Sequence, residues 1–237
     1  MDSENQMEAG IQPEAQFNVF SDKLIRLKFI RKVYGIVCIQ LMVTLGFVLA
    51  FNLSPELGYL AAEPGLGIVA VIVSLASLIT LACCGAARSF PCNIICLGIF
   101  TLSESISVAF ITVSSSSEVL IYAIIVTTIV VVSLTLFAFQ TKIDFTVCNG
   151  ILFIFLIILL VFGILAVFIR NKIFHLLYAC GGALIFSLYL IIDTQMIVGG
   201  NRKHQFSPED YVLAAITLYL DIINLFIFIL RILNSNN

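Results

Sequence analysis

Two aspartates lie inside long apolar stretches, and they are the residues most expected to carry chemistry. Asp193 falls within the stretch from Leu184 to Val198, and Asp221 within the stretch from Tyr211 to Ile232. Moving a carboxylate into hydrocarbon costs at least ~2.5 kcal/mol, so such a group normally faces a helix-bundle interior or a watery cavity and has a partner there. We therefore expect both aspartates to serve a function.

The composition shows which solvent surrounds these stretches. The chain has 237 residues, of which 61% are hydrophobic and 11% are charged. A water-soluble domain has roughly 45–50% apolar and about 25% charged residues, so we predict a polytopic membrane protein. Residues 1–22 are polar and acidic, and we expect a disordered cytosolic arm there, followed by one transmembrane domain over residues 23–237.

Seven apolar stretches approach the ~20 residues that cross a bilayer as a helix. They run over Val33–Phe51, Gly67–Ala87, Ile94–Val113, Val119–Phe139, Val147–Ile169, Leu176–Val198 and Tyr211–Ile232. The predicted fold is therefore all-α, with seven transmembrane helices joined by short loops. Because Asp221 lies in the middle of the last stretch, a re-entrant hairpin is an alternative to the full seventh crossing, which we favour.

Basic residues near the ends of the spans predict the orientation, because they prefer the cytosol. With the N-terminus in the cytosol, nine Lys and Arg residues fall on the cytosolic side and three on the other. The three exceptions are Arg170, Lys172 and Arg231. The N-terminus is therefore predicted to be cytosolic.

Helical spacing places further polar residues beside Asp221. Thr217, Asp221 and Asn224 share one face of the last span, and Asp193 lies on a polar face of the sixth span. We expect the two faces to meet across the bundle. Two carboxylates close together in low dielectric resist double ionisation, so the pair is expected to share a proton.

A basic residue and a third acid complete the candidate site. Arg88, near the cytosolic end of the second span, is the basic residue that this topology places near the acids, as a charge-assisted latch. Glu104 lies on a polar face of the third span. When deprotonated, the Asp193 and Asp221 pair could bind a hard cation such as calcium transiently. The alternative is that the acids only join helices by hydrogen bonds, and it carries more weight for Glu104 than for the pair.

Four segments resemble the transmembrane Bax-inhibitor-motif proteins, in particular the lifeguard or Golgi anti-apoptotic protein branch. They are Phe29–Tyr34, Phe100–Glu104, Phe186–Gln195 and Ser207–Phe226, and the last is the most specific. The resemblance runs from about residue 23 to the end. It implies six helices around a central seventh, an Arg of the second helix as latch, and an aspartate pair, here Asp193 and Asp221, that makes a calcium leak sensitive to pH.

The same resemblance implies residence in Golgi and endoplasmic reticulum membranes, lowered calcium in those stores, and inhibition of apoptosis. Calcium is then the permeant ion, and no cofactor is expected. The expected partners are membrane lipid, calcium ions, calcium-release channels and apoptosis regulators, without nucleic acid, and one chain could form the pore. Glu209, just before the last span, is a candidate for the cytosolic mouth of the pore, although it could simply stabilise the start of that helix.

Other functions fit the sequence less well. An intramembrane aspartyl protease also pairs acids from a sixth and a seventh helix, but its Tyr-Asp and Gly-x-Gly-Asp signatures are missing around Asp193 and Asp221. A seven-helix receptor would have its N-terminus outside the cytosol. We therefore expect no enzyme, and the main alternative to a channel is a non-conducting membrane adaptor that modulates calcium-release channels or apoptosis regulators.

Overall fold

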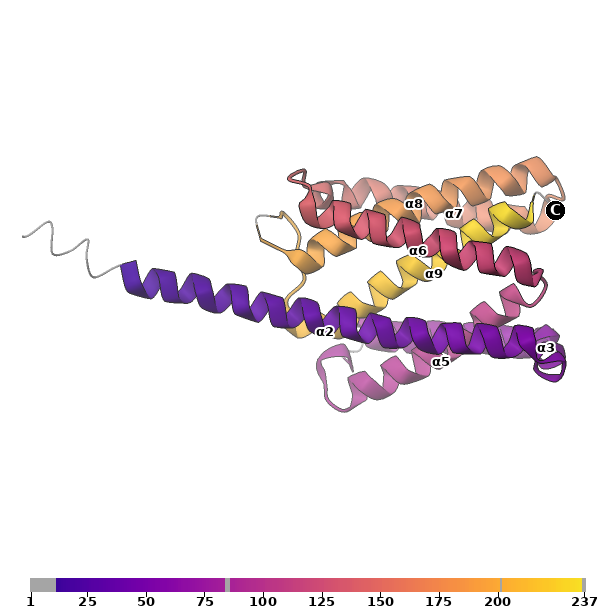
Figure 1. Cartoon of the computed structure of the whole chain (residues 1–237), viewed down its shortest axis with the longest axis horizontal. Helices are drawn as coiled ribbons and strands as arrows, with labels where there is room; N and C mark the ends of the chain where they lie inside the picture. The colour runs from indigo at the N-terminus through magenta and orange to yellow at the C-terminus, as the bar shows by residue number, and fades with distance from the viewer. Residues whose placement is uncertain (1–11, 84–85, 201, 236–237) are drawn as a thin grey trace, which may run out of the picture.

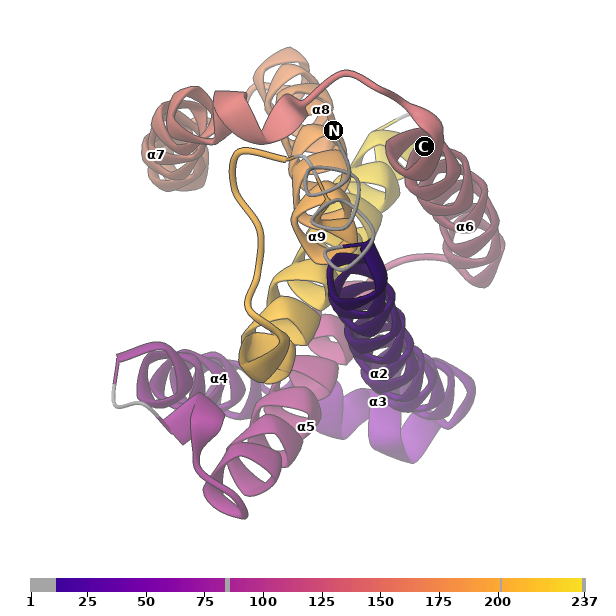
Figure 2. The same ribbon diagram turned by 90° about the vertical axis from the view of Figure 1, so that its left-hand side faces the viewer.

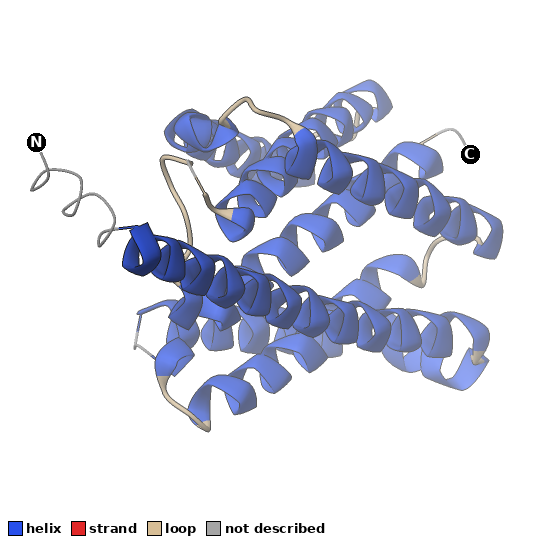
Figure 3. Ribbon diagram, turned by 60° about the vertical axis from the view of Figure 1, so that its left-hand side comes forward, coloured by secondary structure: helices blue, strands red, loops and turns tan. Residues whose placement is uncertain are grey.

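The computed structural model describes residues 12–83, 86–200 and 202–235. Throughout these residues the chain forms helices and short connecting loops, with no strand (Figure 3). Seven of the helices are long and apolar enough to cross a membrane. This confirms the predicted all-α polytopic fold.

The helices begin and end close to the predicted spans. The long helices are α2 (Gln12–Leu53), α4 (Pro64–Cys83), α5 (Cys92–Thr112), α6 (Ser117–Gln140), α7 (Asn149–Phe168), α8 (Lys172–Val198) and α9 (Tyr211–Asn234). The short elements are α3 (Pro55–Ala62) and the 3-10 turns η1 (Ala86–Arg88), η2 (Phe145–Cys148) and η3 (Pro208–Asp210). Side chains cap two of the starts: Ser116 accepts from the backbone of Val119, and Asn171 from that of Ile173.

Helix α2 is longer than the sequence suggested. It begins at Gln12 and so includes residues 12–22, which the sequence assigned to the arm. Pro13 stands in the first turn, where a helix tolerates proline, and the following span supplies the helical nucleus from which this polar segment extends. Residues 1–11 of the predicted arm lie outside the described residues.

Helix α9 passes between two groups of helices, α2, α4 and α5 on one side and α6, α7 and α8 on the other (Figures 1 and 2). It packs against α2, α5, α6 and α8, while α4 packs on α5 and α7 on α8. Of its apolar window 72% is buried, against 11% for α7. Helix α9 is therefore the inner helix, and the outer helices present their apolar side chains to lipid.

Helix α9 is also a full crossing. It is continuous from Tyr211 to Asn234 and runs from the end of the bundle where α2 enters to the opposite end (Figure 1). The re-entrant alternative does not fit this course. Each of the candidate residues on α8 and α9 is thereby held on a regular helix inside the bundle.

Candidate functional site

The structure brings Asp193 of α8 and Asp221 of α9 together in the interior. Asp193 is 9% exposed and Asp221 is 5% exposed. Their carboxyl groups lie within reach of a shared hydrogen bond. The close approach depends on Gly182, because a Cβ there would lie 2.4 Å from the ring of Phe228 on α9. Small residues at such contacts let membrane helices pack closely.

Oδ2 of Asp221 accepts from no donor group among the described residues, so the facing carboxyl group of Asp193 is its one neighbour for a shared proton. Oγ1 of Thr194 and the hydroxyl of Tyr34 make no well-formed hydrogen bond with any described residue, although they lie near each other. Thr194 follows Asp193 on α8, and Tyr34 of α2 lies near it. A buried polar atom without a partner is costly and rare in native proteins. The carboxyl group of Asp221 therefore needs a proton shared with Asp193 to reduce this cost.

The predicted neighbours of the pair lie on the same face of α9. The hydroxyl of Thr217 lies beside Asp193 and donates to the carbonyl oxygen of Ala214 at 3.2 Å. Asn224 uses its amide nitrogen on the carbonyl oxygen of Leu220, 2.8 Å away. The amide oxygen of Asn224 therefore stays available as an acceptor, whereas the hydroxyl of Thr217 is shared between the Ala214 carbonyl and Asp193.

Glu104 is not part of this cluster. It lies on α5, half-buried, with Ser74 of α4 as its hydrogen-bonding neighbour and Tyr219 of α9 nearby. Tyr219 precedes Asp221 by two residues, which is about 200° around a helix, so it faces the other side of α9. Helix α9 therefore separates Glu104 from the aspartate pair.

A hydroxyl network occupies that other side of α9. Oγ1 of Thr44 lies 2.8 Å from the hydroxyl of Tyr219 and 2.9 Å from Oγ of Ser105. One turn earlier, the amide nitrogen of Gln40 donates to Oγ1 of Thr101 at 3.0 Å. These bonds join α2, α5 and α9 and satisfy most of the polar atoms buried between them.

Arg88 does not bridge the aspartates in the structure, in contrast to the expected latch. It lies in η1, outside the membrane-spanning helices, and forms a two-pronged ion pair with Asp210: Nε to Oδ1 is 2.7 Å and Nη2 to Oδ2 is 3.0 Å. This carboxylate raises the pKa of the Arg88 guanidinium above its usual range. Asp221 lies eleven residues further along the chain, or about 16 Å of helix, so Asp210 is the acid within reach.

The start of α9 is fixed by several contacts at this end of the bundle. Besides the Arg88 pair, the amide of Asn93 donates to the hydroxyl of Tyr211 at 2.8 Å, and Nζ of Lys32 lies 3.2 Å from the centre of the Tyr211 ring. Glu209 is exposed beside this ion pair and adds negative charge near Arg88. The predicted mouth residue thus lies at the same end of the bundle as the start of α2.

The end of α8 is held by a residue that the sequence did not single out. Arg26 of α2 donates to three carbonyl oxygens: Met196 at 2.8 Å, Val198 at 3.1 Å and Phe206 at 2.7 Å. Gly199 ends the helix with φ 67°, and a Cβ there would collide with the Arg26 guanidinium. The double glycine was the available sequence signal, because a positive φ after a helix favours glycine.

Gln195, two residues after Asp193, ties the same end of α8 to another loop. Its side chain is fully buried, its amide nitrogen donates to the carbonyl oxygen of Ile143 at 2.9 Å, and its oxygen accepts from the backbone of Phe145 at 2.9 Å. Asp144, between these two, accepts from the hydroxyl and backbone of Thr146, which lowers the pKa of its carboxyl. The end of α8 that follows Asp193 is therefore closed off by a loop whose backbone is hydrogen-bonded to Gln195.

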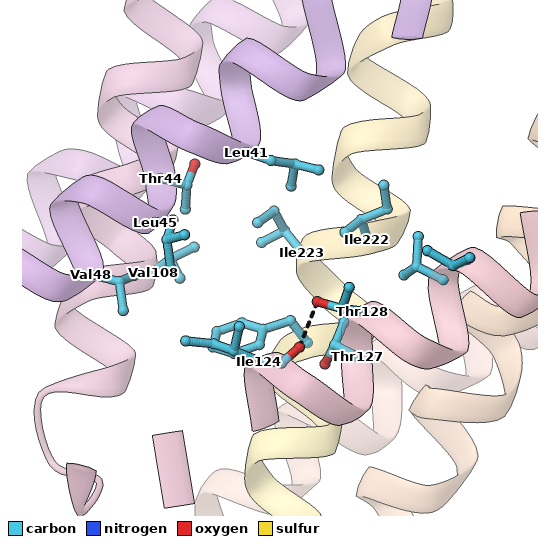
Figure 4. Close-up of a pocket in the computed structure, with 13 residues that line it drawn as sticks. Leu41, Thr44, Leu45, Val48, Val108, Ile124, Thr127, Thr128, Ile222 and Ile223 are labelled. Atoms are coloured by element: carbon cyan, nitrogen blue, oxygen red, sulfur yellow. Dashed lines mark hydrogen bonds between the residues drawn. The ribbon is translucent and has the colours of Figure 1, made fainter. Parts of the chain in front are cut away.

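An apolar cavity of about 300 Å³ lies on the other face of α9, among α2, α5, α6 and α9. In Figure 4 the side chains of Leu41 and Thr44 on α2 face those of Thr127 and Thr128 on α6 across the cavity, with Ile223 of α9 beside them. Neither aspartate lines it. The cavity is therefore separate from the aspartate pair, which is buried between α8 and α9.

Known proteins share much of this sequence. The chain is 39% identical to protein lifeguard 3 of Mus musculus and 38% identical to that of Homo sapiens, in both cases over 92% of this chain and 72% of the relative. It is 35% identical to the Golgi anti-apoptotic protein of Vaccinia virus (strain Lister), over 90% of this chain and 87% of the relative. Residues 26–237 match the family described as Inhibitor of apoptosis-promoting Bax1, and the chain belongs to that family.

Proposed function

We propose that the protein is a pH-sensitive calcium and cation leak of Golgi and endoplasmic reticulum membranes, which lowers store calcium and inhibits apoptosis. The observation that carries the proposal is the buried pair of Asp193 and Asp221, in which Oδ2 of Asp221 has no donor among the described residues and faces the other carboxyl group. Two names support a role in the Golgi and in apoptosis. One relative is a Golgi anti-apoptotic protein, and the family is named for inhibition of apoptosis. No catalytic step is proposed.

The pair acts as a proton switch in this proposal. With one shared proton, the carboxyl groups hold α8 against α9 and the path stays closed. When that proton leaves, two negative charges face each other in low dielectric, and a hard cation that binds both of them relieves the repulsion. Thr217 and Asn224 each add one oxygen atom on the same helix face, so with the two carboxylates the site offers six oxygen atoms, the low end of the 6–8 ligands that calcium takes. Binding in this proposal is transient, as permeation requires.

Contacts at the ends of α8 and α9 hold those helix ends in place and so limit which parts of the bundle can move. Arg26 fixes the end of α8, and the pair of Arg88 and Asp210 fixes the start of α9. Both attachments lie at the end of the bundle where α2 enters, which we propose is the cytosolic end because most basic residues gather there. We assign Arg88 the part of a latch on Asp210, with Glu209 at the cytosolic mouth.

The test is calcium flux through the purified protein in vesicles, measured against pH with an indicator dye inside. The variants are Asp193→Asn and Asp221→Asn, and the matched control is Glu104→Gln, which removes an acid on the other side of α9. The wild-type leak should change with pH. Each aspartate variant should lose that dependence, while Glu104→Gln should keep it.

Two results would count against the proposal. An unchanged pH dependence in both aspartate variants would remove the pair from the mechanism. A wild-type protein that stays silent in vesicles at every pH, although folded by circular dichroism, would point instead to the non-conducting adaptor.

A further inference from the structure

A polar cavity of about 500 Å³ lies at the opposite end of the bundle, between the end of α7, the start of α8 and the end of α9. Two permanent cations line it, Lys172 and Arg231, together with the side chains of His175 and Tyr178. Both cations belong to the three basic residues that fall on the side opposite the predicted cytosolic one. Neither the preference of basic residues for the cytosol nor the aspartate pair explains why Lys172 and Arg231 lie on this side.

The cations of this cavity have no acidic partner among the side chains that the structure describes, which begin at residue 22. Arg231 lies with its guanidinium carbon 5.8 Å from the centre of the Phe228 ring, an apolar support that leaves its N–H donors directed elsewhere. Nε2 of His175 donates to the carbonyl oxygen of Ile169 at 2.7 Å, which fixes the ring beside Lys172. Two positive charges with unused hydrogen-bond donors favour the binding of an anion in this cavity.

The remaining wall of the cavity is apolar and continues into the lipid-facing surface. Val167, in the last turn of α7, lines the cavity and is 78% exposed. Gly163, one turn earlier, leaves room for the hydroxyl of Tyr178, since a Cβ there would lie 2.7 Å from that oxygen. Tyr178 thus places a hydrogen-bond donor between the cations and the apolar wall. A soluble anion would gain nothing from such a wall.

We propose that this cavity binds the phosphate of an anionic phospholipid, with the acyl chains lying along α7. Lys172 and Arg231 contact the phosphate as charge-assisted donors, and the hydroxyl of Tyr178 adds a neutral one. Interfacial basic residues each contribute to the binding of anionic lipids. The site does not depend on the proposed ion leak, because it shares no residue with the aspartate pair.

The chain contains no Trp, so one introduced indole reports on the lipid beside it. Phe168→Trp places this reporter next to Val167, at a position that is 78% exposed and does not line the cavity. The protein is reconstituted into phosphatidylcholine vesicles in which either phosphatidylglycerol or phosphatidylcholine carries brominated acyl chains. Quenching by the anionic lipid should exceed quenching by the zwitterionic one at equal mole fraction.

Charge variants then locate the site. In the Phe168→Trp background, Lys172→Gln and Arg231→Gln should each reduce the preference for phosphatidylglycerol about fivefold, the effect of one interfacial cation, while Lys172→Arg should keep it. The matched control is Arg170→Gln, which removes the same charge two residues before Lys172 but lies outside the cavity, and it should leave the preference unchanged.

Two outcomes would overturn this assignment. An equal loss of preference in Arg170→Gln would mean that general surface charge attracts the lipid. Displacement of the brominated phosphatidylglycerol by millimolar inorganic phosphate would mean that the cavity holds a soluble anion. Circular dichroism of each variant excludes misfolding as the cause, and a normal calcium leak in the same variants would separate lipid binding from the proposed function.

Discussion

On the side of α9 that packs against α2 and α5, the hydroxyl of Tyr219 bonds to Thr44, which also bonds to Ser105. On the side that packs against α8, Asp221 meets Asp193 with one carboxyl oxygen that no donor among the described residues reaches, and the next residue of α8, Thr194, has a hydroxyl without a well-formed hydrogen bond near Tyr34 of α2. The same helix therefore buries polar groups in two ways, with partners on one side and with acids short of partners on the other.

This difference distinguishes polar groups that hold helices together from polar groups that serve a function. A satisfied hydroxyl network costs little to bury and holds helices together, whereas a buried acid without enough partners is expensive and needs a use. Even on the satisfied side two neutral atoms, Oε1 of Gln40 and Oγ1 of Thr127, lack a partner among the described residues, but an amide or hydroxyl oxygen costs far less to bury than a carboxylate. The side that faces α8 is the place to expect protons and ions.

The largest expected effect comes from forcing the acidic side of α9 away from α8. In Gly182→Ala the new Cβ would lie 2.4 Å from the ring of Phe228, so the ring or the helix must move, and we expect a loss of about 3 kcal/mol in stability. Gly181→Ala is the matched control, because nothing lies within 4 Å of its Cβ. Its stability should rise by less than ~1 kcal/mol through helix propensity. Thermal unfolding in detergent measures both.

Equal shifts in the two glycine variants would show that α8 and α9 are not in close contact at Gly182. The pairing of the two aspartates would then lose its structural basis. The opposite pattern, a large loss at Gly182 alone, would tie the aspartate pair to the packing of this one helix interface.

A smaller loss is expected when the end of α8 is released from α2. Arg26→Lys keeps the positive charge near the end of the helix but cannot reach the three carbonyl oxygens that Arg26 now bonds. We expect a loss of about 2 kcal/mol, in the range for a hydrogen bond to a charged group. Arg31→Lys is the control, since Arg31 is exposed on the same helix. If both variants melt alike, the contact of Arg26 with α8 adds no stability.

The sequence was sufficient for the course of the chain through the membrane. Apolar stretches of about the length of the bilayer gave each crossing, including the one through Asp221, and the structure has a long helix for each. The meeting of Asp193 with Asp221 was also predictable, because the cost of burying a carboxylate in hydrocarbon leaves few places for it other than the bundle interior.

The partners of the arginines could not be predicted in the same way. A charged residue near the end of a span is expected only to lie close to water, and both Arg26 and Arg88 do so. The partner of each arginine depends on which carbonyl or carboxylate group the fold brings near it. For Arg26 these are the free carbonyl groups at the end of α8, and for Arg88 it is Asp210. Such contacts between distant residues carry no local pattern.

The smallest effects test the comparison of the two sides of α9 directly. Tyr219→Phe removes a hydroxyl that lies 2.8 Å from Oγ1 of Thr44, so we expect a loss of about 1 kcal/mol, as for other hydrogen bonds between membrane helices. Thr194→Val removes a hydroxyl of similar burial that has no partner, and replacement by an apolar group of the same shape should leave stability unchanged or slightly raised. Thermal unfolding of both variants in one detergent gives the difference. Should Thr194→Val lose as much as Tyr219→Phe, the hydroxyl of Thr194 must be satisfied, and the contrast between the two sides of α9 would rest on the carboxylates alone.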